Sequence, residues 1–441
     1  NGKRRLKMKQ LTRLFIPICL ETLFYMLSGM VDTLMLSAVG DYAVGAVGTA
    51  NSYIGIFIIM FSIISSGMVS VMTQNIGAGR PGVAYQARQL GLLFNAVAGV
   101  LMAVFLFSGA GAILRMVGIA DALYEPALIY LKIVGGGCIL NAVIPIFSSY
   151  LRAFGYTKQP LYATIVGNIA NFVMNAVFLF VLHKGVAGVA AATVISKILN
   201  LCIVLYFSHK LISAKNSTER IANKTVLGQI VKVGLPSACE TALYNVAMML
   251  VIRFLNQMDA EGLNVTARSY TATISNFSYC VGAALAQANA IMTGWHIGAG
   301  ELEECDRGTK RAAFVGVCVA VCMETAIVLG SGFIMPLFTD NPEMTALVRK
   351  LLAIDIVLEI GRVTNLVFGQ ALKTSGDAVF PAVIAAVFMF VFAVGGTWLF
   401  GISMGLMAVG AYIGLASDEC VRAVGMVWRW KTGKWRTKKL V

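Results

Sequence analysis

Apolar stretches of bilayer length follow one another along almost the whole chain. A helix rises about 1.5 Å per residue, so crossing the hydrocarbon core takes roughly 20 mainly apolar residues. Twelve stretches of the 441-residue sequence fit this length: 11–36, 51–74, 87–113, 128–151, 161–182, 186–208, 228–256, 268–294, 312–337, 348–372, 381–401 and 404–428. Charged residues are only 13% of the chain, too few to cover a soluble protein of this size. The pattern predicts an all-α membrane protein with twelve transmembrane helices.

The basic residues that give the chain its net charge of +14 are concentrated in alternate connections between the predicted spans. If the N-terminus is cytoplasmic, 26 Lys and Arg residues fall in inner connections and the tail, five fall outside and four lie within spans. Cytoplasmic loops carry such an excess, and it suits the anionic headgroups of membrane lipids. We therefore expect a multi-pass protein of the cell's inner (plasma) membrane with both termini cytoplasmic. Basic residues gathered on one soluble face would indicate nucleic-acid binding, and this distribution argues against such a partner.

The two halves of the sequence resemble each other. Three blocks recur at offsets of 219 or 221 residues: 13–37 with 232–256, 76–79 with 297–300, and 151–160 with 372–381. Each half holds six predicted spans, an even number, so both halves have the same orientation and pair about a pseudo-twofold axis along the membrane normal. We predict an N-lobe (1–208), a cytoplasmic linker (209–227) and a C-lobe (228–441) that includes the basic tail. A central cleft between two six-helix bundles is typical of a transporter that rocks its lobes.

Ionisable and amide residues interrupt the predicted spans of the first half. Glu21 and Asp32 are 11 residues apart, which places them on one face of a helix about 16 Å apart along its axis. A polar stripe at i, i+3 and i+7 crosses the fifth span: Asn168, Asn171 and Asn175. Such a stripe either lines a site or hydrogen-bonds neighbouring helices. Lys197, on one face of the sixth span with Thr193, either snorkels or balances Glu21; Asp32 has no basic residue within a helical turn.

The second half carries its own polar stripe, in the tenth span. Asp355, Glu359 and Arg362 follow i, i+4, i+7 spacing, so Glu359 and Arg362 are close enough to form an ion pair. This pair is interpreted as structural rather than functional. Glu324 stands in an apolar stretch of the ninth span with no visible partner, and the sequence suggests no role for it.

These features together resemble the multidrug and toxic compound extrusion (MATE) family. Its members typically have a proline and, fifteen residues later, an acid in the first span; here these are Pro17 and Asp32. Further matches are a Q-x-x-GAG turn at 74–79, an LRA-x-G-x(4)-P stretch at 151–160, the Asn stripe, and an R…G-x-W tail of Arg429, Gly433 and Trp435. The resemblance implies twelve helices in two lobes and export of cationic or amphipathic organic compounds, driven by inward H⁺ or Na⁺.

The resemblance also implies a coupling site in the N-lobe, closer to the DinF-like than to the NorM-like branch. The matching positions are Asp32, Asn171, Asn175 and Thr193, with Asn175 replacing an acid. Where the NorM-like branch has an acid of a C-lobe Na⁺ site, this chain has Arg362, which argues against that site. A carboxylate among neutral amide and hydroxyl groups favours its protonated form. The expected coupling ion is therefore H⁺ in preference to Na⁺.

The repeat-related residues Glu21, Tyr25, Glu240 and Tyr244 are candidates for the substrate cavity. We expect a monomer that needs no cofactor or metal. Two alternatives stay open: a flippase of lipid-linked oligosaccharides from the same superfamily, which usually has fourteen spans and a basic cavity, and a membrane-embedded enzyme. An enzyme would need a clustered nucleophile or paired metal ligands, whereas the three His and nine Cys residues are scattered.

Overall fold

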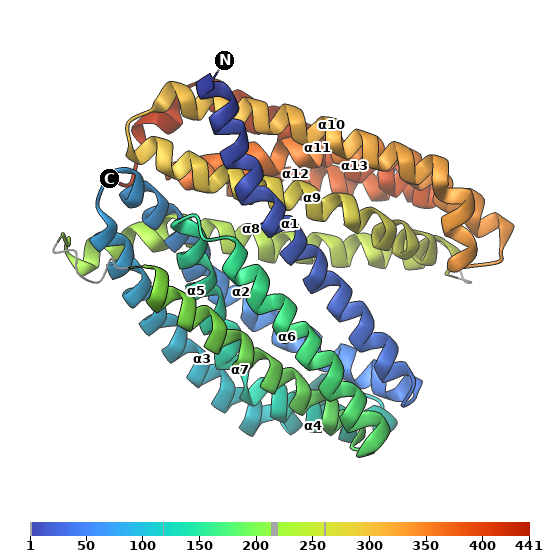
Figure 1. Cartoon of the computed structure of the whole chain (residues 1–441). Coiled ribbons are helices and arrows are strands. Elements are labelled where there is room, and N and C mark those ends of the chain that lie inside the picture. The colour runs from blue at the N-terminus through green and yellow to red at the C-terminus, as the bar shows by residue number, and fades with distance from the viewer. Residues whose placement is uncertain (1, 118, 213–218, 260–261) are drawn as a thin grey trace. The chain divides into compact units, whose positions relative to one another are not determined.

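A computed structural model describes residues 2–117, 119–212, 219–259 and 262–441, and these residues form helices joined by short turns, with no strand among them (Figure 1). The chain divides into two compact units. Residues Thr12–Gly234 form the N-terminal unit, and Asn1–Leu11 with Leu235–Val441 form the C-terminal unit. The predicted linker 209–227 includes 213–218, which lie outside the described residues, so the lobe boundaries stay a prediction.

Six helical segments follow one another in the first half of the chain. Their bounds are α1 (Gly2–Ser37), α2 (Asp41–Gly77), α3 (Pro81–Val117), the pair α4 (Asp121–Gly136) and α5 (Cys138–Ala153), α6 (Lys158–Ala176) with the π-helical η1 (Val177–Val181), and α7 (Gly185–Leu211). The axes of α4 and α5 differ by 42° at Gly137. A buried apolar cluster that includes Leu106, Leu114 and Leu131 joins these helices.

The second half of the chain repeats this order. It contains α8 (Asn223–Met258), α9 (Leu263–Gly298), α10 (Leu302–Ile334) with η3 (Met335–Leu337), α11 (Pro342–Ser375), α12 (Val379–Phe388) with the π-helical η4 (Met389–Val394) and η5 (Thr397–Ser403), and α13 (Met407–Lys431) with η6 (Lys434–Thr437). Two buried clusters pack it, one around Leu351 and Leu352 and one around Trp430 and Trp435.

The predicted twelve-span architecture is confirmed among the described residues. Eight helices are long and apolar enough to cross a membrane, and the bent α4–α5 pair makes nine. The other three long helices, α9, α11 and α13, are more polar than these nine and are not apolar enough to be recognised as spans by composition alone. All three belong to the C-terminal unit, where α11 and α13 carry charged residues in their middle.

Turn glycines confirm the internal repeat at the level of the backbone. The IGAG blocks both end in a glycine with φ of +76°, Gly79 and Gly300. The alignment of the third matched block pairs Gly155 (φ +84°) with Gly376 (φ +98°). Residues other than glycine rarely adopt positive φ, so the repeated glycines mark the same sharp helix-to-helix turns in both halves.

Candidate ion and substrate sites

A hydrogen-bonded cluster of α1 and α6 surrounds Asp32. The Asn175 amide Nδ2 donates to Asp32 Oδ1 at 2.8 Å and to Asn171 Oδ1 at 3.1 Å. Asn175 is fully buried, and its own Oδ1 has no hydrogen-bond partner among the described residues. The structure thus brings three of the four predicted coupling residues into direct contact. Asn168 of the same stripe instead donates to the Phe24 carbonyl of α1 at 3.0 Å, the role of hydrogen-bonding a neighbouring helix.

Thr193, the fourth predicted residue, lies on α7 and donates to its own helix, to Val189 O at 2.9 Å. Its hydroxyl also lies within hydrogen-bonding reach of Tyr130, which in turn reaches Asn51. Tyr130 and Asn51 were not predicted from the sequence. Neither carries a charge or falls in a recognisable spacing, so only the packing of α2, α4 and α7 shows their place beside the cluster.

Lys197 corrects two expectations. Its ammonium group donates to Asn141 Oδ1 at 2.7 Å and lies close enough to Asp32 for a direct electrostatic interaction. The expectation that Asp32 lacks a compensating positive charge is therefore wrong. Lys197 is also not the counter-ion of Glu21, because Glu21 pairs with Arg152 at 2.6 Å. Residues 32 and 197 are too distant in sequence for helical spacing to have revealed their proximity.

The two glutamates proposed as cavity residues form equivalent ion pairs. Glu21 of α1 binds Arg152 of α5, and Glu240 of α8 binds Lys373 of α11 at 2.7 Å between Nζ and Oε2. Arg152 and Lys373 are themselves matched at the offset of 221, so the repeat preserves the whole pair. The positive partners balance the charges of both acids, so neither glutamate gives the cavity a net negative charge. Tyr25 is 72% exposed.

An open hollow of about 700 Å³ lies along α1 in the N-terminal unit, and Asp32 is not part of its lining. Its lining comes mainly from one face of α1 and is rich in thioether and aliphatic side chains: Met26, Gly29, Met30, Thr33, Leu34, Ser37 and, from α2, Val44. Ligand pockets usually measure roughly 300–1,000 Å³, so the hollow has room for an organic compound.

The C-terminal unit has a more polar cavity of about 270 Å³. Its walls include Tyr244, Tyr279, Asp355, Arg362, Tyr412 and Glu419. Of the two cavity residues predicted in this unit, Tyr244 lines this cavity and Glu240 does not. The mixture of carboxylates, guanidinium groups and phenols makes this cavity chemically unlike the apolar hollow along α1.

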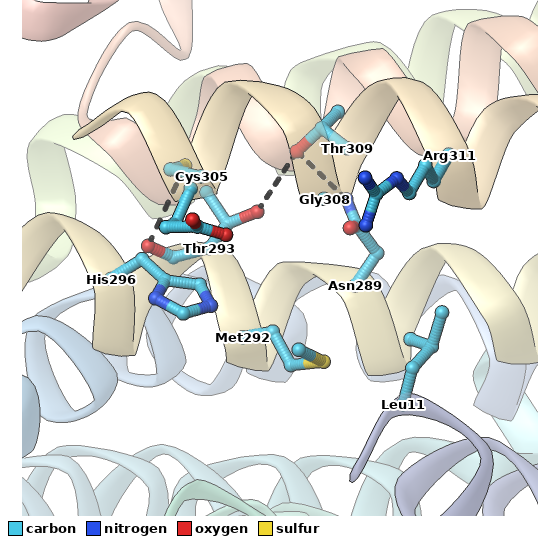
Figure 2. Close-up of a pocket in the computed structure, with 10 residues that line it drawn as sticks. Leu11, Asn289, Met292, Thr293, His296, Cys305, Gly308, Thr309 and Arg311 are labelled. Atoms are coloured by element: carbon cyan, nitrogen blue, oxygen red, sulfur yellow. Dashed lines mark hydrogen bonds between the residues drawn. The ribbon is translucent and has the colours of Figure 1, made fainter. Parts of the chain in front are cut away.

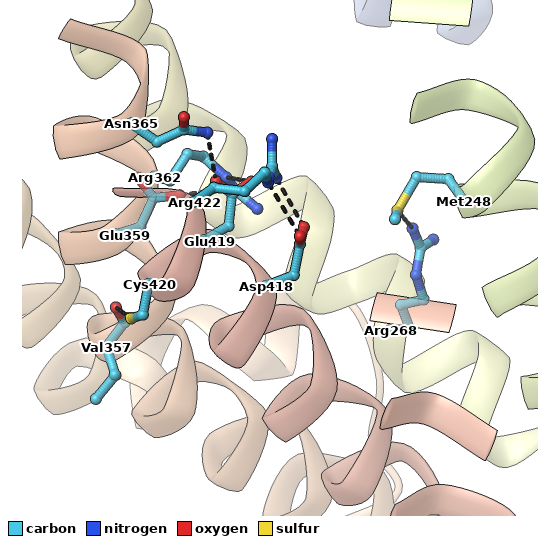
Figure 3. Close-up of polar contacts among 10 residues, drawn as sticks. All are labelled: Met248, Arg268, Val357, Glu359, Arg362, Asn365, Asp418, Glu419, Cys420 and Arg422. Atoms are coloured by element: carbon cyan, nitrogen blue, oxygen red, sulfur yellow. Dashed lines mark hydrogen bonds and ion pairs between the residues drawn. The ribbon is translucent and has the colours of Figure 1, made fainter. Parts of the chain in front are cut away.

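A buried ion-pair network includes Arg362, Asp418 and Glu419 from the wall of this cavity (Figure 3). Arg362 pairs with Glu359 on α11, as the i, i+3 spacing predicted, and its Nε lies 3.6 Å from Glu419 of α13. Arg422 binds Asp418 through two hydrogen bonds of 3.0 and 2.7 Å and Glu419 at 2.8 Å. Both carboxylates of α13 are buried.

The charges on α13 were not predicted from the sequence. The 26 basic residues expected on the inner side include Arg422 as the first residue of the basic tail, and that placement is wrong, because Arg422 lies within α13 and is buried. The signal was present in the sequence: Asp418, Glu419 and Arg422 have the i, i+3 and i, i+4 spacing of a helical ion-pair cluster. The predicted end of the last span at 428 should have placed all three inside it.

A smaller pocket of the C-terminal unit lies between α9 and α10 near the IGAG turn (Figure 2). Three of its lining residues make long hydrogen bonds with one another: Thr309 Oγ1 lies 3.4 Å from both Asn289 Nδ2 and Thr293 Oγ1. The pocket's volume is about 40 Å³, close to the share of one water molecule in the liquid, about 30 Å³. It is too small for an organic substrate and is a packing feature.

Comparison with known proteins gives a consistent result along the whole chain. The MatE family model matches residues 17–177 and 236–399, two segments that begin at the repeat-related Pro17 and Pro236. The uncharacterized transporter YisQ of Bacillus subtilis is 32% identical over 428 residues, which cover 96% of this chain and 94% of that protein. The probable multidrug resistance protein NorM of Thermotoga maritima is 20% identical over 446 residues, covering 98% and 94%.

Solved structures share the fold at low sequence identity. A crystal structure of MATE in the straight conformation superposes with a TM-score of 0.87 at 21% identity and covers 97% of both chains. The outward-facing conformation of a multidrug resistance MATE family transporter of the MOP superfamily gives a TM-score of 0.88 at 20% identity, over 97% of this chain and 96% of that one.

Proposed function

Since this chain belongs to the MatE family of membrane transporters, we propose that it is a secondary antiporter that exports cationic or amphipathic organic compounds in exchange for inward protons. The likeness to a probable multidrug resistance protein supports this substrate class. The excess of basic residues in alternate connections supports an inner-membrane location with both termini cytoplasmic. Rocking of the two lobes would carry the exchange.

The geometry around Asp32 is the observation that supports the coupling site. The carboxylate accepts the Asn175 amide and lies near the Lys197 ammonium. Protonation of Asp32 removes its negative charge, so the attraction to Lys197 is lost and the hydrogen bond from Asn175 weakens. Both partners lie on other helices, α6 and α7, so a change at Asp32 alters how strongly α1 is held to them.

The same contacts support a proton over a sodium ion. Na⁺ is a hard cation that prefers several oxygen ligands and net negative charge. Here the amide nitrogen of Asn175 faces the carboxylate, and an N–H group cannot ligate a cation. Lys197 adds a positive charge close to the same carboxylate. This charge opposes the binding of Na⁺ and of H⁺ alike, so the preference for a proton rests on the missing oxygen ligands.

The open hollow along α1 supports substrate binding on the helix that carries the coupling residue. Its methionines, Met26 and Met30, are flexible and polarizable, and such side chains adapt to ligands of different shape. Asp32 lies on another face of the same helix, turned toward Asn175 of α6. Substrate in the hollow and a proton on Asp32 would therefore act on each other through α1, and this linkage would provide the exchange that an antiporter requires.

Everted vesicles containing the full chain provide the test. Efflux of ethidium, a lipophilic cation, is followed with a pH gradient and a Na⁺ gradient imposed separately. We expect transport with the pH gradient alone and none with Na⁺ alone at fixed pH. Transport driven by Na⁺ without any response to the pH gradient would contradict proton coupling. Absence of efflux with either gradient, for cationic and neutral amphiphiles alike, would contradict export of these compounds.

A further inference from the structure

Glu324 of α10 is a buried carboxyl group without a hydrogen-bond partner. Its side chain has 0% relative exposure, and neither carboxylate oxygen accepts a hydrogen bond from any described residue. The Ser278 hydroxyl of α9 faces it without reaching hydrogen-bond geometry. A bare carboxylate in such a place would lose its hydration with no replacement, which costs several kcal/mol or more.

The neighbours of Glu324 make its negative charge still less favourable. Asp355 and Glu359, one helical turn apart on α11, are the two charged groups that act on it most strongly, and both are buried. The guanidinium group of Arg362 acts on it more weakly. Arg362 is already engaged by Glu359 and Glu419, so its charge is shared among several acids.

A charge count over the described part of this cluster leads to the same result. Five carboxyl groups are buried on α10, α11 and α13: Glu324, Asp355, Glu359, Asp418 and Glu419. The two guanidinium groups bound within the cluster are those of Arg362 and Arg422. If every carboxyl were ionised, this interior would hold an excess of negative charge in a low-dielectric surrounding. Protons reduce that excess, and Glu324 is a favourable place for one because neither of its oxygens accepts a hydrogen bond from a described residue.

Asp355 connects Glu324 to water. It lines the cavity of about 270 Å³, a volume that holds several water molecules at about 30 Å³ each. The same residue, on α11, is near enough to Glu324 to act on it electrostatically. A proton that enters the cavity can therefore bind Asp355 and pass to Glu324, which leaves Asp355 ionised again and converts the Glu324 carboxylate into the neutral acid.

We propose that Glu324 is a proton-binding residue of the C-terminal unit, loaded from the cavity through Asp355. The ligand is H⁺ and not Na⁺, because Na⁺ prefers several oxygen ligands, whereas the Ser278 hydroxyl faces Glu324 without a hydrogen bond and Arg362 adds a positive charge nearby. Proton binding there does not depend on the proposed function. Its use in transport rests on that function, since it would add a second titrating site to the one at Asp32.

Infrared spectroscopy of the full chain in lipid membranes tests the proposal without any transport assay. A protonated carboxylic acid gives a C=O stretching band that a carboxylate lacks. In difference spectra between acidic and alkaline pH, we expect this band in the wild type, with one carboxyl per chain lost in Glu324→Gln. The exposed Glu303→Gln variant is the matched control and should keep the buried-acid band. Asp32→Asn should keep the Glu324 signal as well, even if export proves not to be proton-driven.

Three outcomes decide against the proposal. One is a wild-type spectrum that Glu324→Gln leaves unchanged. Another is a Glu324 signal that NaCl abolishes at fixed pH, which would identify Na⁺ as the ligand. If Glu324→Gln fails to fold, Glu324→Asp keeps an acid at this position and should shift the band, and an unshifted band would overturn the assignment. Asp355→Asn should keep the Glu324 band and slow its response to a pH jump; an unchanged response would remove Asp355 from the route.

Discussion

The two units share a backbone plan but differ in the chemistry of their interiors. Both have helix turns at repeat-related glycines, and both have a glutamate on the first helix of the repeat paired with a basic residue, Glu21 with Arg152 and Glu240 with Lys373. Beyond this plan they diverge. The N-terminal unit places the Asp32 carboxylate among amides beside Lys197, whereas the C-terminal unit contains a network of buried acids and guanidinium groups.

The contrast indicates that the repeat preserves the features that the fold requires, whereas the residues available for function have diverged. The turn glycines and the ion pairs Glu21–Arg152 and Glu240–Lys373 hold helices in position, so both halves need them. Buried ionisable groups in membrane helices are costly and usually functional, and they are the features that the two halves do not share. We therefore expect perturbations of the interiors to have large and different effects in the two units, and perturbations of the shared plan to have small and similar ones.

The largest effect is expected from Asp32→Asn in the N-terminal unit. The substitution preserves the size of the side chain but removes the group that binds the proton, so proton-driven ethidium efflux should fall to the level of vesicles without the transporter. Ethidium binding to the purified protein should remain detectable. The control is Asn168→Ala, which alters the same polar stripe at a residue that contacts Phe24 and not Asp32.

Normal efflux by Asp32→Asn would show that coupling lies elsewhere, and the C-terminal network would then be the first place to look. A loss of efflux in Asn168→Ala as severe as in Asp32→Asn would instead indicate that any disturbance between α1 and α6 stops transport. Asp32 would then have no special role.

A large loss of stability is expected from Arg422→Leu in the C-terminal unit. Asp418 and Glu419 would keep their burial but lose their closest cation, and leaving buried charges unpaired typically costs about 3–5 kcal/mol. The comparison variant is Arg152→Leu, whose ion pair with Glu21 is partly exposed and should matter less. Thermal unfolding of both proteins in the same detergent measures the difference. Equal losses would contradict the idea that the C-terminal interior is the more tightly charge-balanced of the two.

Close glycine packing in the N-terminal unit gives a moderate effect. A Cβ atom at Gly234 of α8 would lie 1.7 Å from the carbonyl oxygen of Ile63 on α2, and one at Gly67 would lie 2.0 Å from that of Ile230. Gly234→Ala should therefore force α2 and α8 apart and lower stability by about 1–3 kcal/mol. Gly228→Ala is a matched control one and a half turns away, because a Cβ there meets nothing within 4 Å.

Gly228→Ala should be neutral or stabilising by up to about 1 kcal/mol, since alanine favours the helix. Thermal unfolding in detergent distinguishes the two variants. Similar stabilities for both would show that the helices tolerate a methyl group at Gly234. The close approach of α2 and α8 would then contribute nothing measurable to stability.

Much of the architecture was predictable from the sequence, because span length, charge bias and the internal repeat are all local or one-dimensional signals. The i, i+4 relation of Asn171 and Asn175 likewise placed both on one helix face, and the structure turns that face toward Asp32. Partners on different helices were not predictable. Periodicity tells which residues share a face but not which helix lies opposite, so Arg152 beside Glu21 and Lys197 beside Asp32 emerged only from the packing.

The smallest effect is expected from the glutamates that the two units share. As a candidate residue of the substrate cavity, an unpaired Glu240 would attract cationic dyes, so Glu240→Gln would weaken their transport more than that of neutral dyes. The ion pairs of Glu240 with Lys373 and of Glu21 with Arg152 change that expectation, because each acid already has a cation close by. Glu21→Gln and Glu240→Gln should each cost within about 1 kcal/mol of stability, as partly exposed pairs do. Initial efflux rates of ethidium and of a neutral dye should fall together in both variants. A selective loss of ethidium transport in one variant alone would show that its glutamate attracts substrate despite its partner, and that the units differ even in the plan they share.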